Sequence, residues 1–208
     1  MIAGALVWLV AAPAAAGGKE AEPEVPVGMA GHFQQASLLM LAVAVNDDRG
    51  AKDLAKDLAG NKAAPSPLRE AAKRVAGKVG KAEKVSPEVA QLARTCANCH
   101  LAGGHGPQPH DTAVVPGDDP TEKHIMAAMF AWIGLVTPQE QPFRLGLQEL
   151  LPPVFIESDA EVHEAADTLR GWVEEAEQAS SWDERADLFG HVLATCAECH
   201  ERARVVSR

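Results

Sequence analysis

The sequence predicts an all-α protein that consists of two tandem four-helix bundles. Helix-forming Ala, Leu, Glu and Lys are abundant and Tyr is absent. No segment shows the sustained alternation of apolar and polar residues that is typical of a β-strand. The second half of the chain also repeats the first half in three blocks that occur in the same order. A repeat of this kind indicates a duplicated folding unit.

The first 27 residues are expected to lie outside the bundles. Residues 1–16 are almost entirely apolar and end in three alanines, a pattern typical of a cleaved signal peptide, although no Lys or Arg precedes the apolar run. This run is shorter than the roughly 20 residues that a membrane-spanning helix needs, which favours cleavage over a retained anchor. Residues 17–27 are small, acidic and Pro-containing, as in a flexible tether. We therefore expect export to the periplasm and no stable membrane span.

The repeat sets the domain boundaries. Residues 94–100 (RTCANCH) align with residues 194–200 (ATCAECH), 100 positions later. Residues 69–79 align with residues 163–173, and residues 32–58 align without a gap with residues 124–150, 92 positions later. We expect a first bundle over residues 28–105, a Gly- and Pro-rich linker over residues 106–118 and a second bundle over residues 119–208.

Helix-capping patterns predict four helices in each unit. In the second unit a capping residue precedes Glu by three positions four times, in DPTE (119–122), TPQE (137–140), SDAE (158–161) and SWDE (181–184). In the first unit Asp47 and Asp48, followed by Gly50, separate the first helix from the second, and the pairs SP at 66–67 and 86–87 mark the third and fourth helices. Each bundle then ends with a cysteine motif in its last helix.

These motifs carry the strongest functional signal. All four cysteines lie in Cys-x-x-Cys pairs, and a histidine follows each pair directly. This pattern is typical of covalent haem attachment, because two such thiols reach the two vinyl groups of one haem while the next imidazole binds the iron from the same side. We therefore expect two covalently attached haem c groups. The expected attachment residues are Cys96, Cys99, Cys196 and Cys199, with His100 and His200 as proximal iron ligands.

Three other interpretations of the cysteines are weaker. Two structural disulfides would be strained within so short a spacing and would not explain the histidines. A thioredoxin-like redox pair requires a βαβ context, and a four-thiolate zinc ribbon normally has its pairs 15–20 residues apart.

The repeat also nominates the ligands on the far side of each iron. Among the remaining histidines only His32 and His124 align, and each precedes an apolar stripe at helical spacing. Since the start of the first helix lies near the end of the fourth in an antiparallel bundle, we expect these two imidazoles to be distal ligands. Two alternatives remain open: five-coordinate irons without a distal ligand, or a different register in which Met129 takes the place of His124.

The pattern resembles the four-helix-bundle c-type cytochromes, the class that includes cytochrome c prime, here in tandem. The specific resemblance lies in the two Cys-x-x-Cys-His motifs near the ends of fourth helices. In the second unit the basic Arg204 also follows His200 by four positions, as in that family, whereas the first unit has Gly104 there. Cytochrome c prime keeps an open iron and binds gases, but His32 and His124 favour a six-coordinate relative.

Charge is divided unevenly along the chain. Residues 25–105 carry 11 Lys and Arg against 7 Asp and Glu, whereas residues 106–208 carry 7 against 19. This asymmetry fits two interpretations, charged faces that are simply solvated or electrostatic docking of redox protein partners, and we expect no nucleic acid binding. The expected function is single-electron transfer by a diheme cytochrome of the bacterial cell envelope. The alternatives are a gas-binding or gas-sensing haem protein and, less favoured because no acid/base residues are evident, a peroxidase or reductase.

Overall fold

The computed structural model describes residues 27–103, 120–150 and 160–206. Within these ranges the chain forms eight helices and no strand, which confirms the predicted all-α class for this part of the protein. The predicted signal peptide, the linker and all but the last residue of the tether lie outside the described residues. None of the described helices combines the length and hydropathy needed to cross a bilayer.

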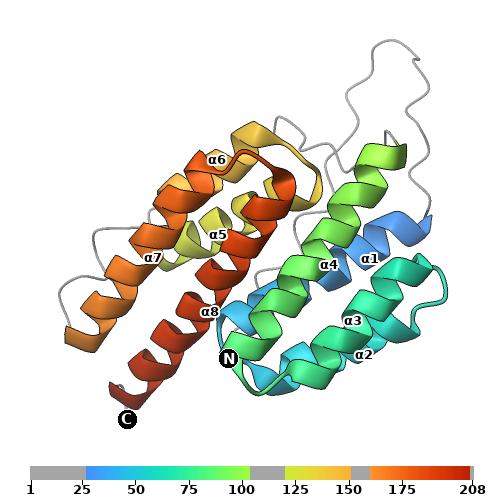
Figure 1. Cartoon of the computed structure of the whole chain (residues 1–208). Helices are drawn as coiled ribbons and strands as arrows, with labels where there is room; N and C mark the ends of the chain where they lie inside the picture. The colour runs from blue at the N-terminus through green and yellow to red at the C-terminus, as the bar shows by residue number, and fades with distance from the viewer. Residues whose placement is uncertain (1–26, 104–119, 151–159, 207–208) are drawn as a thin grey trace, which may run out of the picture.

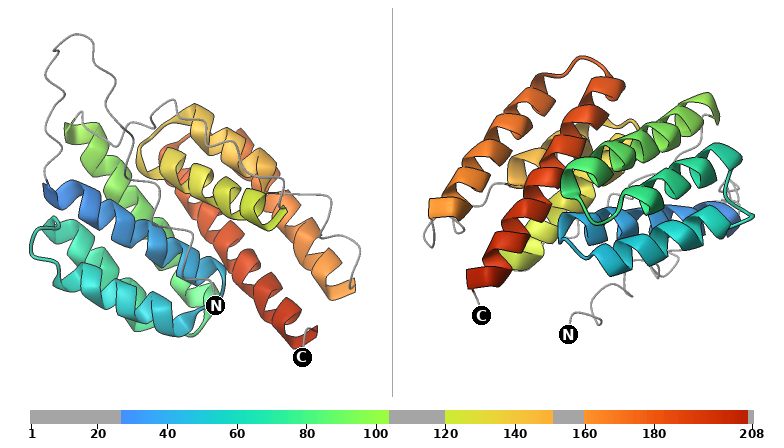
Figure 2. Two further views of the ribbon diagram at one scale, coloured as in Figure 1. Left: turned by 180° about the vertical axis from the view of Figure 1, so that it is seen from behind. Right: turned by 60° about the horizontal axis from the view of Figure 1, so that its bottom comes forward.

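Four helices precede the predicted linker and four follow it. The first set is α1 (Val27–Ala44), α2 (Asp48–Gly60), α3 (Ser66–Lys78) and α4 (Ala82–Gly103). The second set is α5 (Pro120–Val136), α6 (Glu140–Glu149), α7 (Ala160–Gln178) and α8 (Trp182–Val206). Helices α4 and α8 pack along each other and run in opposite directions (Figure 1). Seen from behind, α1 and α5 form the opposite layer (Figure 2).

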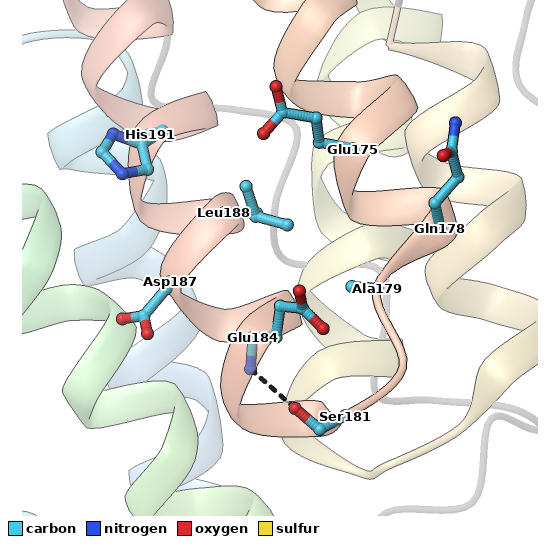
Figure 3. A pocket seen from close by; sticks show the side chains of 8 residues that line it. All are labelled: Glu175, Gln178, Ala179, Ser181, Glu184, Asp187, Leu188 and His191. Atoms are coloured by element: carbon cyan, nitrogen blue, oxygen red, sulfur yellow. Dashed lines mark hydrogen bonds between the residues drawn. The ribbon is translucent and has the colours of Figure 1, made fainter.

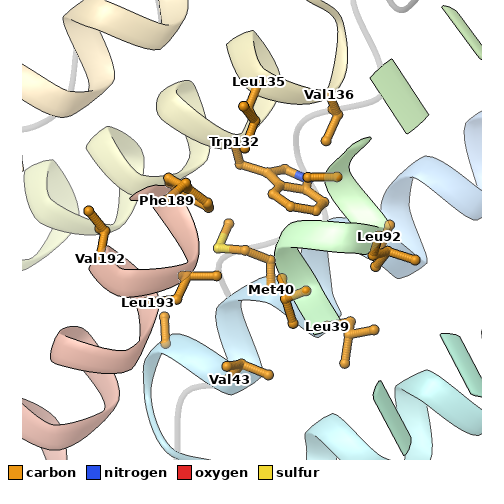
Figure 4. Close-up of a cluster of buried hydrophobic side chains, with 14 of the residues drawn as sticks. Leu39, Met40, Val43, Leu92, Trp132, Leu135, Val136, Phe189, Val192 and Leu193 are labelled. Atoms are coloured by element: carbon orange, nitrogen blue, oxygen red, sulfur yellow. The ribbon is translucent and has the colours of Figure 1, made fainter. Parts of the chain in front are cut away.

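Contacts between the two sets of helices are extensive. Helix α1 packs more closely against α8 than against α4, and α5 packs more closely against α4 than against α8. Buried side chains from both halves form a single apolar cluster, in which Met40, Leu92, Trp132 and Phe189 converge from α1, α4, α5 and α8 (Figure 4). The indole Nε1 of Trp132 also donates a hydrogen bond to Ser37 Oγ at 3.1 Å. The division into two bundles therefore stays a prediction, because the described helices share one core.

The turns after α1 and α5 have the same hydrogen bonds at positions 92 residues apart. The amide of Asp47 donates to Ala42 O at 2.8 Å, and the amide of Gln139 donates to Gly134 O at 2.8 Å. Asn46 ends α1 with φ of 54°, a left-handed conformation that asparagine tolerates better than most residues. The repeated sequence thus folds into a repeated turn.

Two predicted helix starts need correction. Helix α4 begins at Ala82, so Ser86 is buried within it and Pro87 lies inside the helix. Helix α8 begins at the equivalent residue, Trp182, which lies 100 positions after Ala82. The two cysteine motifs are also 100 positions apart, so their alignment could have indicated where α4 begins. Helix α6 begins at Glu140, because the Thr137 hydroxyl donates back to Ile133 O at 2.7 Å instead of capping α6.

The predicted break between α1 and α2 and the predicted start of α8 are confirmed, and both α2 and α8 begin with a side-chain cap. The Asp47 carboxylate accepts a hydrogen bond from the amide of Gly50 at 3.0 Å. The Ser181 hydroxyl accepts one from the amide of Glu184 at 3.2 Å, and the Glu184 carboxylate accepts one from the amide of Ser180 at 2.9 Å. Both helices thus satisfy amides that helix geometry leaves without partners.

One arginine and one glycine bring helices of the second half into close contact. Arg185 of α8 is buried, forms a two-pronged ion pair with Glu140 of α6, and lies over the Trp182 ring at 4.6 Å. Helices α5 and α6 approach so closely that a Cβ on Gly146 would lie 2.1 Å from the Ala131 amide nitrogen. No larger residue fits at Gly146 without moving a backbone.

Candidate haem sites

Each cysteine motif lies on one face of a helix. Cys96, Cys99 and His100 occupy α4, at spacings of three and four residues that place side chains on the same side. The equivalent residues of α8 have the same spacing, and all four cysteines are free thiols. The alanine-rich flanks favour a helix here, and the hydroxyl of Thr95, a weaker helix former, donates to Gln91 O at 2.8 Å within the helix.

Burial distinguishes the two thiols of each motif. Cys96 is partly buried and Cys99 exposed, whereas Cys196 is buried and Cys199 partly buried. Burial raises the pKa of both Cys96 and Cys196 to about 12, with a further contribution from the second cysteine of each motif. The first thiol of each motif therefore stays protonated near neutral pH, and a thiolate is favoured at neither position.

The two motifs lie at opposite ends of the helix pair, because α4 and α8 run in opposite directions (Figure 1). Four thiolates cannot meet at one zinc ion in this arrangement. Within the described ranges, no group of three or more His, Cys, Asp or Glu side chains is placed to hold a metal ion. A haem requires less from the protein, since the porphyrin supplies four iron ligands and only the two axial positions need side chains.

Both motif histidines are fixed by a backbone carbonyl. His100 Nδ1 lies 2.6 Å from Val136 O, and His200 Nδ1 lies 2.7 Å from Ala44 O. A carbonyl can only accept, so each Nδ1 carries the proton and donates it. The lone pair of each neutral ring is then on Nε2, the nitrogen left for a metal. This tautomer and this second hydrogen bond are what an axial haem ligand needs.

His124 lies directly against His200. The two ring centroids are 6.2 Å apart and the ring planes are inclined by 70°. Two imidazoles that bind one metal ion through nitrogens at about 2.0–2.1 Å have centroids roughly 6 Å apart, so the observed spacing fits a shared iron. Burial first, and then the neighbouring His200, lower the pKa of His124, which favours the neutral form that can ligate. The residues at this end of the molecule therefore fit a haem with two histidine ligands.

The other end of the molecule is built from equivalent residues. His32 is buried at 7% exposure near the start of α1. Helices α1 and α4 contact each other, and the start of α1 and the end of α4, which carries His100, lie on the same side of the molecule in Figures 1 and 2. This arrangement leaves room for a first-helix histidine near the fourth-helix motif, and the proximity of His32 to His100 stays a prediction. Iron ligation by His32 and His124 stays a prediction.

The remaining described histidines lie away from these sites. His163 is exposed on α7, and His191 is exposed and stacks on Trp172, with ring centroids 4.4 Å apart. His105 and His110 lie outside the described residues. An open, acidic pocket of about 650 Å³ lies between α7 and the start of α8, lined in part by Glu175, Glu184 and Asp187 (Figure 3). It contains no residue of either cysteine motif.

The role of the Ala44 and Val136 carbonyls could not be predicted, since any residue has a main-chain oxygen that can accept a hydrogen bond. One signal was available: the two residues occupy equivalent positions in the repeat, 92 apart, at the ends of α1 and α5. Comparison with known proteins finds no family model, no curated protein and no solved structure that matches this chain.

Proposed function

We propose that this protein is a diheme c-type cytochrome that carries single electrons in the bacterial cell envelope. The observation that carries the proposal is the facing pair His124 and His200, whose ring spacing fits one iron while Ala44 O holds the second nitrogen of His200. Haem iron supplies one-electron redox chemistry when it is bound. His124 and His200 would hold such an iron from two sides and leave no position for a gas, which favours electron transfer over gas binding.

The attachment chemistry supports covalent haem. Each motif offers two thiols one helical turn apart, and the following histidine already points its Nδ1 at a carbonyl. The raised pKa of Cys96 and Cys196 disfavours thiolate metal binding at these positions and is compatible with thioethers, which carry no charge. An apolar signal-like segment at residues 1–16 is consistent with the periplasm as the site of assembly.

Charge on the surface differs between the two halves of the described chain. Exposed acidic side chains gather on α7 and the start of α8, whereas α2, α3 and the start of α4 carry most of the lysines. Redox partners that dock by complementary charge would bind faster at low ionic strength.

Haem stoichiometry tests the proposal. The protein is produced in the periplasm of a host that attaches c-type haem, and its intact mass and pyridine haemochrome spectrum are measured. We expect two haems per chain, and one haem in each of the double variants C96A/C99A and C196A/C199A. A matched control, Ala97→Ser, leaves both attachment sites complete and should retain two haems. Purification from the periplasm of a folded chain that carries no haem would contradict the proposal.

A further inference from the structure

The hydrogen bonds of the motif histidines cross between the two halves of the chain. His100 belongs to α4 but bonds to Val136 at the end of α5, and His200 belongs to α8 but bonds to Ala44 at the end of α1. Each acceptor is the last residue of its helix. The final carbonyls of a helix have no partner within the helix and carry its negative partial charge.

Helices α1 and α5 therefore each contribute to both ends of the molecule. Helix α1 carries His32 in its second turn and ends with Ala44, which holds His200 of α8. Helix α5 carries His124 in its second turn, where it faces His200, and ends with Val136, which holds His100. Neither half of the chain supplies a complete histidine site alone.

We infer that the C-terminal carbonyls of α1 and α5 are the positioning groups for the haem-attachment histidine of the opposite half. Each carbonyl fixes the Nδ1–H tautomer of its histidine and orients Nε2. This inference rests on the proposed haem function and adds that each haem is tuned by the half of the chain that does not attach it.

The tuning has a definite direction. An Nδ1–H that donates to a carbonyl at the negative end of a helix makes the imidazole a more basic ligand, which stabilises ferric over ferrous iron and lowers the reduction potential. Loss of the hydrogen bond from His200 to Ala44 O should therefore raise the reduction potential of the haem on Cys196 and Cys199. Loss of the hydrogen bond from His100 to Val136 O should raise that of the haem on Cys96 and Cys99.

Asn46 allows this to be tested without touching a ligand. Its left-handed conformation ends α1 just after Ala44. Valine is strained at positive φ, so Asn46→Val favours continuing the helix, and a continued helix would let Ala44 O accept the amide of Asp48 instead of His200 Nδ1–H. Asn46→Gly is the matched control, because it also removes the asparagine side chain but tolerates positive φ.

The reduction potentials of the two haems are measured by spectroelectrochemistry. The variants C96A/C99A and C196A/C199A, which each keep one haem, first show which redox transition belongs to which haem. Asn46→Val should raise the potential of the haem on Cys196 and Cys199 and leave the other haem unchanged. Asn46→Gly should retain both wild-type values. A shift confined to the haem on Cys96 and Cys99, or none in a folded, fully loaded Asn46→Val protein, would overturn the inference while leaving the haem proposal intact.

A second measurement covers the case in which Asn46→Val does not fold. In the reduced wild-type protein labelled with ¹⁵N-histidine, the Nδ1–H protons of His100 and His200 should exchange slowly with solvent. Exchange of both protons at the rate of a free imidazole would contradict the inference, whether or not haem is attached. Absence of haem from the purified protein would instead refute the proposed function.

Discussion

His124 and His200 face each other with ring centroids 6.2 Å apart, although 76 positions separate them in the sequence. They come from the start of α5 and the last turns of α8, and a third element, the end of α1, holds the other nitrogen of His200. Three helices thus converge on one imidazole. This convergence, more than the motif alone, supports the proposal that His124 and His200 share one haem iron.

Thiol reactivity should differ sharply within the haem-free chain. Cys196 is 7% exposed and burial raises its pKa to about 12, whereas Cys99 is exposed. Iodoacetamide reacts with thiolate, so at pH 8 Cys99 should be alkylated much faster than Cys196. The rate at Cys196 should keep rising as the pH approaches 12, instead of levelling near the ordinary thiol pKa of about 8.5. Mass spectrometry of peptides follows each site.

The control for thiol reactivity is the same chain in concentrated guanidinium chloride, where both cysteines should react alike. Equal rates in the folded chain would show that Cys196 is accessible and would refute the predicted burial.

Loss of Arg185 should weaken the second half. Its guanidinium binds Glu140 at two atoms, donates to Ala179 O at 3.2 Å and covers the Trp182 ring. Because Glu140 remains half exposed and can be rehydrated, Arg185→Met should cost about 2 kcal/mol of unfolding free energy rather than the larger loss of a fully buried pair. Chemical denaturation measures this.

The matched control for Arg185 is Arg170→Met, which removes an exposed ion pair with Asp167 on one helix. Such pairs contribute at most about 1 kcal/mol, so this variant should stay near wild type. Equal losses in the two variants would argue against Arg185 as the link between α6 and α8.

Two glycines should respond in opposite ways to alanine. At Gly146 the new Cβ would lie 2.1 Å from the Ala131 backbone and force α5 and α6 apart, which should cost at least about 2 kcal/mol. At Gly171, within α7, no atom lies within 4 Å of the Cβ position, so Gly171→Ala should stabilise the helix by about 0.5–1 kcal/mol. Thermal unfolding of both variants checks the signs. A stabilised Gly146→Ala protein would mean that α5 and α6 are not in backbone contact.

Much of the fold followed from local sequence chemistry. Ser181 predicted the start of α8, and Asp47 and Asp48 predicted the break between α1 and α2, because a side-chain oxygen next to free amides acts over a few residues. The prediction that α4 begins at Ser86 and Pro87 was wrong because it also used only local sequence. These two residues resemble a helix start, but α4 begins at Ala82 and tertiary packing buries Ser86 inside it. A local signal cannot reveal that a helix has begun one turn earlier.

The candidate sites were predictable only in part. The repeat pointed to His32 and His124, since equivalent residues in a duplicated chain occupy equivalent places. It could not show that Ala44 and Val136 serve the opposite half, because exchange of helix ends between units leaves no trace in either unit's sequence. Which helices of the two halves pack together is decided by apolar side chains such as Met40 and Trp132, which would also suit a core within one bundle.

The most direct test of the account is the electron paramagnetic resonance and visible spectrum of the haem-loaded protein, alone and as His124→Ala, with and without CO. His163→Ala, on the exposed face of α7, is the matched control. We predict low-spin spectra without CO binding for the wild-type and control proteins. In His124→Ala, one of the two haems should become high-spin and bind CO. A wild-type protein that already has a high-spin, CO-binding haem, or a His124→Ala spectrum identical to wild type, would contradict the assignment of His124 and His200 to one iron.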